Sequence, residues 1–177
     1  MIEAIRELEE IAGLVELSEK RAKQVIARAI NDTMKSIRHQ MLQVASGMTD
    51  VMYKILRERT HLIKANVKNL EGDHSMIILS IPAILLGARQ NASGVKAGKH
   101  FFRSAFIAKA NKGPFKFRVY RRKYKRYNPE HPGYPIEDVR IPIKEDTELA
   151  HAYAERQVDE KFLKNLTRHL KLAGGLL

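Results

Sequence analysis

The stretch that decides the fold covers residues 18–47, SEKRAKQVIARAINDTMKSIRHQMLQVASG. Apolar residues recur there at steps of three and four, which is the spacing of one face of an α-helix. Ser18 is a suitable N-cap, and Gly47 is a suitable residue for the helix to end at. The sequence therefore predicts one long amphipathic helix of about seven to eight turns with a single apolar stripe.

The segments around this helix predict a single α+β domain of 177 residues. Residues 1–17 have the pattern of a short helical arm, and residues 18–58 form the helical part. Residues 60–143 carry the patterns of a small, mostly antiparallel sheet, and residues 145–172 predict a C-terminal helix. We expect the long N-terminal helix and the C-terminal helix to pack on this sheet.

Finer expectations concern the borders of these elements. Thr49 and Asp50 have the chemistry of a cap and a first-turn carboxylate, which predicts that a short second helix starts there. Strands are predicted at residues 62–67, 76–79, 101–108, 115–122 and 136–143. Two basic loops are predicted at residues 87–99 and 121–135, since both contain residues typical of turns, and the first of them is either a mobile hairpin tip or a loop.

Net charge is +12, and it is distributed unevenly along the chain. No Asp or Glu occurs between Asp73 and Glu130, whereas thirteen Lys and Arg lie from Arg89 to Arg126. The rest of the chain has 19 basic and 20 acidic residues, so the whole positive surplus belongs to this window. Such a concentration of cations indicates a polyanionic partner, usually nucleic acid and sometimes an acidic protein surface or lipid.

The densest part of this window is FKFRVYRRKYKRY, residues 115–127. Alternation along its first half predicts a strand with Phe115, Phe117 and Val119 facing the core and its cations facing outward. We predict that these cations contact phosphates without reading base sequence. The predicted contact residues are Lys116, Arg118, Arg121, Arg122, Lys123, Lys125 and Arg126. The alternatives are a solvated loop, a clamp for an acidic subunit, and base stacking on Tyr120, Tyr124 and Tyr127.

Other chemistry finds little support in the sequence, and no catalytic residue, cofactor or metal is predicted. The chain has no Cys, and its seven His are not paired at the spacing of metal ligands. The stretch 94–99, GVKAGK, resembles a phosphate loop, but it has three residues between its glycines instead of four, and His100 follows its lysine. Glu137 and Asp138 lie near the basic window, where a nuclease would hold metals, yet a solvated strand edge is the expected role for both.

No membrane segment is expected either. The apolar run at residues 76–88 is interrupted by Ser80 and Pro82 and is too short to span a bilayer. The acidic N-terminus lacks the basic start and the apolar core of a signal peptide.

Five segments in a fixed order resemble the prophage minor tail protein Z family of tailed phages and the related tail-completion or neck proteins. They are ARAINDTMKSIRHQM, KILRERTHLIKANVKN, IPAILLGARQNASGVKAGKHFFRSAFIAKANKG, FRVYRR and YPIEDVRIPI, and together they cover about residues 25–145. Ser104 stands where the family pattern often has Gly. The tract at residues 121–134 is longer and more basic than the pattern.

The resemblance implies a non-enzymatic structural protein of the virion, assembled in the host cytoplasm. Such a protein forms a ring, here of six or twelve copies, at the head-proximal end of the tail. Its implied partners are further copies of itself, the tail terminator or tail tube, the head–tail connector and the double-stranded genome in the lumen. The long helix and the C-terminal helix would pack subunits together. The predicted interface residues are Ile26, Ile30, Ile37, Met41, Phe162 and Leu166.

Two other functions remain open from the sequence. A free, sequence-independent nucleic-acid-binding protein would need the same basic window but no ring. An enzyme acting on phosphodiesters would show cleavage that depends on magnesium or manganese.

Overall fold

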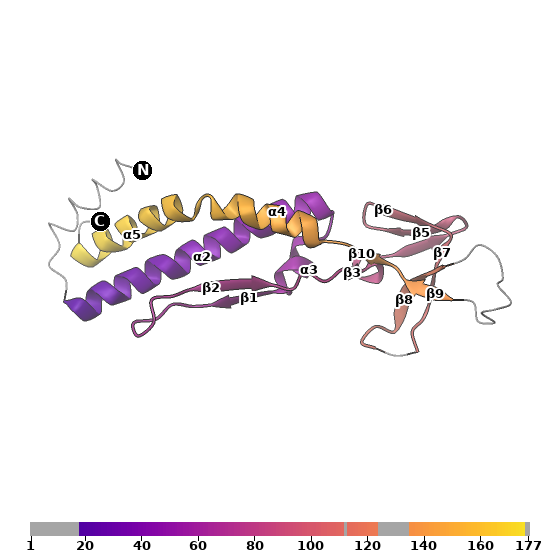
Figure 1. Cartoon of the computed structure of the whole chain (residues 1–177), viewed down its shortest axis with the longest axis horizontal. Helices are drawn as coiled ribbons and strands as arrows, with labels where there is room; N and C mark the ends of the chain where they lie inside the picture. Colours follow the sequence, from indigo (N-terminus) through magenta and orange to yellow (C-terminus); the bar gives the residue numbers. More distant parts are fainter. Residues whose placement is uncertain (1–17, 112, 124–134, 176–177) are drawn as a thin grey trace. The chain divides into compact units, whose positions relative to one another are not determined.

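The computed structural model of the chain describes residues 18–111, 113–123 and 135–175 (Figure 1). It is α+β, as predicted, with a long N-terminal helix, a helical C-terminus and small antiparallel sheets. Where the sequence predicts one domain, the structure groups its residues into two compact units. The helical unit contains described residues up to 44 together with 57–77 and 148–175. The sheet unit contains residues 45–56 and the described part of 78–147.

The long helix, α2 (Glu19–Thr49), begins directly after Ser18, whose carbonyl accepts a hydrogen bond from the Ala22 amide at 2.9 Å. It runs past Gly47, where the sequence predicted its end. The Thr49 hydroxyl donates to the Ala45 carbonyl at 2.6 Å, so Thr49 closes this helix instead of capping the next one. Asp50 then takes a left-handed φ of 55°, which breaks the helical path. The short helix α3 (Tyr53–Arg57) therefore starts later than the predicted cap at Thr49 and Asp50.

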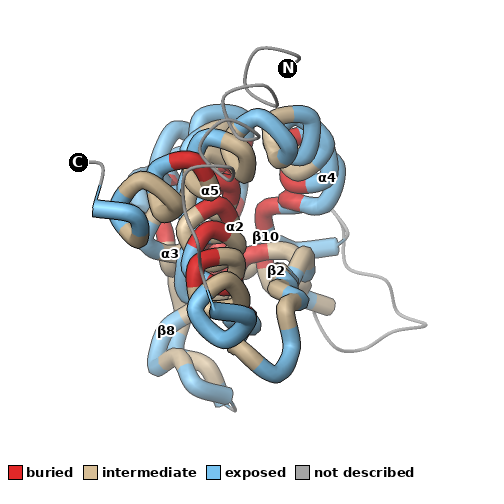
Figure 2. Tube along the Cα trace, turned by 90° about the vertical axis from the view of Figure 1, so that its left-hand side faces the viewer, coloured by how far each residue is buried: buried red, intermediate tan, exposed pale blue. Residues whose placement is uncertain are grey.

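The buried residues of α2 recur along one face, as its sequence predicts. Figure 2 shows them as red segments along the tube, interrupted by tan and pale blue. Those in the helical unit are Val25, Ala27, Ala29, Thr33, Ile37, Met41 and Leu42. Small side chains among them allow close packing of neighbouring elements.

A two-stranded hairpin belongs to the helical unit. Its strands β1 (Thr60–Ile63) and β2 (Asp73–Met76) pair antiparallel. Both strands begin two to three residues before the predicted ranges 62–67 and 76–79 and end three to four residues before them. The physical reason is visible at Ala65, whose amide donates to Asn31 Oδ1 and whose carbonyl accepts from Asn31 Nδ2, both at 2.9 Å. A side chain of α2 thus takes over the backbone hydrogen bonds that a longer strand would have used.

The C-terminal segment forms two helices, α4 (Lys144–Glu155) and α5 (Val158–Gly174), where the sequence predicted one. The break lies at Gln157, whose amide donates to the Ala154 carbonyl at 3.1 Å. Neither Gly nor Pro marks this position, so the sequence gives no signal for it. Helix α5 ends two residues after the predicted range, at Gly174, and Gly175 adopts the left-handed conformation that closes many helices.

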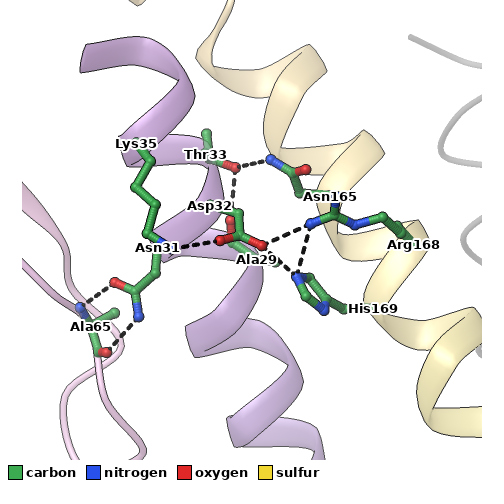
Figure 3. Close-up of polar contacts among 9 residues, drawn as sticks. All are labelled: Ala29, Asn31, Asp32, Thr33, Lys35, Ala65, Asn165, Arg168 and His169. Atoms are coloured by element: carbon green, nitrogen blue, oxygen red, sulfur yellow. Dashed lines mark hydrogen bonds and ion pairs between the residues drawn. The ribbon is translucent and has the colours of Figure 1, made fainter. Parts of the chain in front are cut away.

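Polar side chains join α2 to α5 (Figure 3). The Asp32 carboxylate accepts hydrogen bonds from Arg168 at 2.7 Å and lies 2.9 Å from His169 Nε2. One turn away, Asn165 Nδ2 donates to Thr33 Oγ1 at 3.0 Å. Burial alone would raise the pKa of Asp32, but hydrogen bonds and charge from Lys35 and His169 outweigh it and lower that pKa. Because Asp32 stays ionised, these contacts hold the two helices in one register.

The sheet unit contains three small sheets. Strand β3 (Ile81–Pro82) pairs antiparallel with β10 (Arg140–Ile141) and is followed directly by the 3-10 helix η1 (Ala83–Leu86). A three-stranded sheet contains β4 (Arg89–Asn91), β5 (Gly94–Ala97) and β6 (His100–Arg103). A second contains β7 (Ala105–Lys109), β8 (Phe117–Arg122) and β9 (Ile136–Asp138). Val95 and Ala97 on β5 and Val119 on β8 are fully buried, so each of these two sheets contributes to the core.

The segment 87–99 was predicted to be a mobile hairpin tip or a loop, and it contains the β-hairpin formed by β4 and β5. Another expectation about this unit was wrong. Residues 101–108 were predicted to be one strand, and they form parts of β6 and β7, which meet at Ser104. Ser104 has a φ of 58°, a backbone conformation that glycine adopts without steric cost.

Candidate nucleic-acid interface

Arg118, a predicted phosphate contact, is mostly buried and already paired. Its guanidinium Nη1 lies 3.6 Å from the Asp138 carboxylate, and its side chain is 20 % exposed. Arg140 Nε donates to the same Asp138 oxygen at 3.1 Å. A Cβ at Gly113 would lie 2.3 Å from the Arg118 guanidinium, so this glycine leaves room for it. Arg118 is therefore held beside a carboxylate of the neighbouring strand, and its contact with phosphates stays a prediction.

Arg121 likewise pairs with a carboxylate of the adjacent strand β9. It lies opposite Glu137 in the register of β8 and β9. Its Nε and Nη2 both donate to Glu137 Oε1, at 3.1 and 2.7 Å. The two carboxylates of β9 were predicted to lie on a solvated edge; the structure places them against the arginines of the neighbouring strand. The acid-free window is therefore partly neutralised by the residues that follow it.

The remaining predicted contacts lie at the ends of β8. Lys116, Arg122 and Lys123 are exposed, and the Lys116 ammonium is 5.8 Å from the centroid of the Phe117 ring. Phe117 is itself 47 % exposed, against the expectation that it faces the core. Lys125 and Arg126 lie outside the described residues.

Of the three tyrosines considered for base stacking, only Tyr120 lies within the described residues. The Tyr120 ring lies 6.1 Å from the Phe106 ring on the neighbouring strand, at an angle of 37°. This is ordinary packing between aromatic side chains, so Tyr120 contributes to the sheet. Tyr124 and Tyr127 lie outside the described residues.

The outer face of the β4–β5–β6 sheet holds a second group of cations, which we call the basic face. The strand register places Arg89 opposite Lys96, and Lys96 opposite Phe101. Arg103, two residues beyond Phe101, shares this side of the sheet. All four side chains are exposed, whereas the alternate residues Val95 and Ala97 are buried. The basic face is therefore defined by Arg89, Lys96, Phe101 and Arg103.

Arg89 and Lys96 form a pair of like charges directly across two strands, an arrangement that costs stability. Within the described parts of the chain, no acidic group pairs with Arg89, Lys96 or Arg103. Lys99, farther along the hairpin, is in contrast paired with Asp50. A hollow of about 300 Å³ adjoins the like-charged pair and is lined by Leu86, Gly87, Arg89, Lys96 and Gly98. An anion at this place would remove the repulsion and find no competing carboxylate in the hollow's lining.

Close backbone packing shapes this sheet. A Cβ at Gly94 would lie 2.2 Å from the Phe102 carbonyl oxygen, so only glycine fits at the start of β5. The turn before it is held by Asn91, whose side-chain oxygen accepts from the amides of Ser93 and Gly94 at 3.1 and 2.9 Å. The hairpin thus fixes the register that brings Arg89 and Lys96 together.

The sequence contained a signal for the basic face, although the prediction did not use it. Asn91 to Gly94 has the composition of a tight turn, and cations lie on both sides of it. Residues 87–99 were predicted to be a mobile hairpin tip or a loop, without strands on either side of the turn. Alternation from Gly94 to Ala97 would have placed Lys96 outward and Val95 inward.

The predicted interface residues divide by burial. Ile37 and Met41 are buried within the chain, at 6 % and 0 % exposure, so the fold of one chain accounts for them. Ile26, Ile30, Phe162 and Leu166 are half-buried and remain candidates for contact with another subunit.

Metal and membrane chemistry can be examined over the part of the chain that the structure describes. There, no three His, Asp or Glu side chains are grouped as metal ligands.

His74 and His151 stack with ring centroids 6.0 Å apart. Burial, followed by the nearby charges of His151 and Arg38, lowers the pKa of His74 despite the opposing effect of Asp73. Over the described residues, no helix combines the length and the apolar character needed to cross a bilayer.

Comparison with known proteins gives one match. No curated protein and no solved structure matches the chain significantly. The sequence model of the family described as prophage minor tail protein Z (GPZ) matches residues 2–173, nearly the whole chain. This chain therefore belongs to the prophage minor tail protein Z family and has a structural role in the tail of a virion.

Proposed function

We propose that this minor tail protein is a tail-completion or neck component. It forms a ring of six or twelve copies at the head-proximal end of the tail, between the tail terminator or tail tube and the head–tail connector. The ring joins tail to head and surrounds the double-stranded genome on its path. It acts without catalysis, and it assembles in the host cytoplasm before it becomes part of the virion.

The observation that carries the DNA contact is the basic face. Arg89, Lys96 and Arg103 are exposed on one side of a sheet and lack acidic partners among the described residues. Cations of this kind attract phosphates with a strength set by salt and without base specificity. A channel for a genome needs this property, because every sequence must pass. A ring repeats the face in each copy, so three cations per subunit suffice.

Support for subunit packing is the set of half-buried apolar residues on α2 and α5. Ile26 and Ile30 lie on α2, and Phe162 and Leu166 lie on α5. Each of them retains apolar surface that a neighbouring subunit would cover.

The test compares two triple variants in a phage that encodes this chain. The first is Arg89→Gln, Lys96→Gln, Arg103→Gln on the basic face. The matched control is Lys20→Gln, Lys54→Gln, Lys164→Gln, which removes the same charge from exposed lysines elsewhere. Imaging of the head–tail junction should show the ring in both particles. DNA density beside the ring and retention of the genome should fall only in the first.

Purified protein provides the quantitative test. The slope of log affinity against log salt for duplex DNA should weaken by about 2.7 in the basic-face variant, because each lost phosphate contact contributes about 0.9. The control should keep the slope of the unmodified chain. Equal slopes for the two variants would refute DNA contact by the basic face. Failure of ring assembly in the basic-face variant alone would instead assign this face to an acidic neighbouring subunit.

A free nucleic-acid-binding protein is the second candidate, since the basic face suits it equally well. Size separates the two functions. A ring component sediments as a closed oligomer or is found in particles at the head–tail junction. A chain that binds DNA with the same salt slope, stays monomeric or dimeric and is missing from purified particles would support the second candidate.

A further inference from the structure

Two histidines meet inside the helical unit, one from β2 and one from α4. The rings of His74 and His151 lie nearly parallel, with 10° between their planes and 6.0 Å between their centroids. Neutral aromatic rings at this separation pack favourably. We call this pair the histidine contact. It joins one strand of the β1–β2 hairpin to a C-terminal helix.

The two rings differ in the surroundings that a proton would meet. His151 is 43 % exposed, and its Nδ1 lies 3.5 Å from the Glu155 carboxylate, so a charge there has both water and a counter-ion. In contrast, Nε2 of His74 is buried and has no hydrogen-bond partner among the described residues. A neutral imidazole has one nitrogen without a hydrogen, whereas an imidazolium carries N–H on both nitrogens. Protonation of His74 would therefore place an unpaired donor, with a charge, in a buried position.

The charged groups that face His74 act on it as well. Arg38 of α2 and His151 of α4 both disfavour a positive charge there, and Asp73 of its own strand has the opposite effect. The residue opposite His74 on β1 is Leu62, which carries no charge. Burial is the largest influence, and with the two cations it lowers the pKa of His74 below the ordinary value of 6.5.

The other strand of the hairpin is held to α2 by groups that do not titrate near neutral pH. Arg38 Nε donates to Thr60 Oγ1 at 2.7 Å, and its Nη2 donates to the Arg57 carbonyl at 3.1 Å. Asn31 makes hydrogen bonds to both backbone groups of Ala65. A proton on the buried ring therefore weakens the contact of β2 with α4, while β1 stays attached to α2.

We propose that the histidine contact is a pH-sensitive switch, which holds β2 against α4 while both rings are neutral and releases β2 when His74 takes up a proton.

Acid favours the released form by linkage. The released ring lies in water and binds a proton at its ordinary pKa, whereas the packed ring binds it less readily. The packed form therefore keeps its full stability above pH 6.5. As pH falls below this value, the released fraction rises by at most about tenfold per pH unit. The rise ends once the pH is below the pKa of the packed ring.

Amide hydrogen exchange of the full chain tests the switch, with each rate divided by the intrinsic rate at the same pH. Protection of the β2 amides should fall several-fold from about pH 7.5 to about pH 5, while protection in the middle of α2 should stay constant. His74→Phe keeps a ring against His151 but cannot take up a proton, so its protection should not depend on pH. The matched control is His61→Phe, which changes an exposed histidine opposite Ser75 in the same hairpin and should keep the fall.

The unmodified chain gives a second measurement that needs no variant. By NMR, the His74 imidazole should titrate below pH 6.5, and the amides of β2 should shift over the same range. Titration of His74 at or above pH 6.5 would overturn the proposal. An equal fall of protection in His74→Phe and the unmodified chain would overturn it too, as would an equally large fall in α2, which would mean that acid unfolds the whole helical unit. None of these measurements uses DNA or phage assembly, so they are independent of the proposed ring.

Discussion

Strand β8 and the basic face each carry three cations from the same window of sequence without Asp or Glu. The two sets differ in whether the neighbouring strand supplies carboxylates that pair with them. On β8, Arg118 and Arg121 are paired with Asp138 and Glu137 of β9. On the basic face, the strand next to Lys96 supplies Arg89, which is another cation. The number of charges in a segment is therefore a poor guide to the number that a ligand can reach. Whether a cation stays accessible to a ligand depends on the side chains of the neighbouring strand, which comes from a different part of the sequence.

The largest effect is expected when the pairing on β8 is removed. Asp138→Ala should reduce the free energy of unfolding by about 2 kcal/mol, because it leaves Arg118 mostly buried without its carboxylate. Glu137→Ala removes a more exposed partner and should cost under about 1 kcal/mol. Urea titration of the two variants measures both. Equal losses would show that the two arginines are held alike.

A second change would make β8 resemble the basic face. Glu137→Gln frees Arg121, which is already 53 % exposed, and removes one negative charge. Affinity for duplex DNA should rise several-fold, and the salt slope should steepen by about 0.9, the contribution of one phosphate contact. Glu148→Gln removes the same charge from an exposed site on α4 and serves as control. If both variants gain the same affinity, net charge alone accounts for the change.

The junction between the two sheets permits a smaller test. Ser104 joins β6 to β7 with a φ of 58°, which costs a residue with a side chain about 1 kcal/mol relative to glycine. Ser104→Gly should therefore stabilise the chain by roughly 0.5–1 kcal/mol, after part of the gain is lost to the greater freedom of the unfolded chain. Thermal unfolding measures the change. A decrease in stability would mean that the Ser104 side chain contributes contacts that outweigh the backbone strain.

The smallest expected effect is on the basic face, where one substitution should change stability and DNA affinity in opposite directions. Lys96→Glu replaces a pair of like charges with an opposite pair, which should stabilise the hairpin by about 0.2–1 kcal/mol. The same change should weaken DNA binding. A variant that gains stability and loses affinity would indicate that the repulsion between Arg89 and Lys96 is retained for binding. Lys96→Gln, which relieves the repulsion without creating attraction, should give an intermediate result in both measurements.

Local patterns predicted much of the fold. The start of α2 after Ser18 and the end of α5 at Gly175 follow from capping chemistry that acts within one turn. The strand at β8 follows from alternation and from the turn that precedes it. Each of these predictions depends on residues that are near one another in sequence.

The errors arose where distant residues decide the structure. The end of β1 depends on Asn31, more than 30 residues earlier. The ion pair of Arg118, which the sequence did not predict, depends on Asp138, 20 residues later. The sequence shows that these groups exist but not which strand lies beside which. The helix break at Gln157 has no Gly or Pro to indicate it. At residue 104, a glycine would have indicated the positive φ, but the residue is Ser.

The tight fit at Gly94 has a consequence for anyone who screens this protein by random mutagenesis. Every substitution there would have to displace the backbone of β6, so the position should tolerate no replacement. A selection for infectious particles would rank Gly94 with the residues that we propose to contact DNA, although Gly94 itself only packs against the backbone of β6. Depletion of variants at position 94 would thus report on whether the hairpin of β4 and β5 folds. Only variants at positions 89, 96 and 103 would report on the role of the exposed cations.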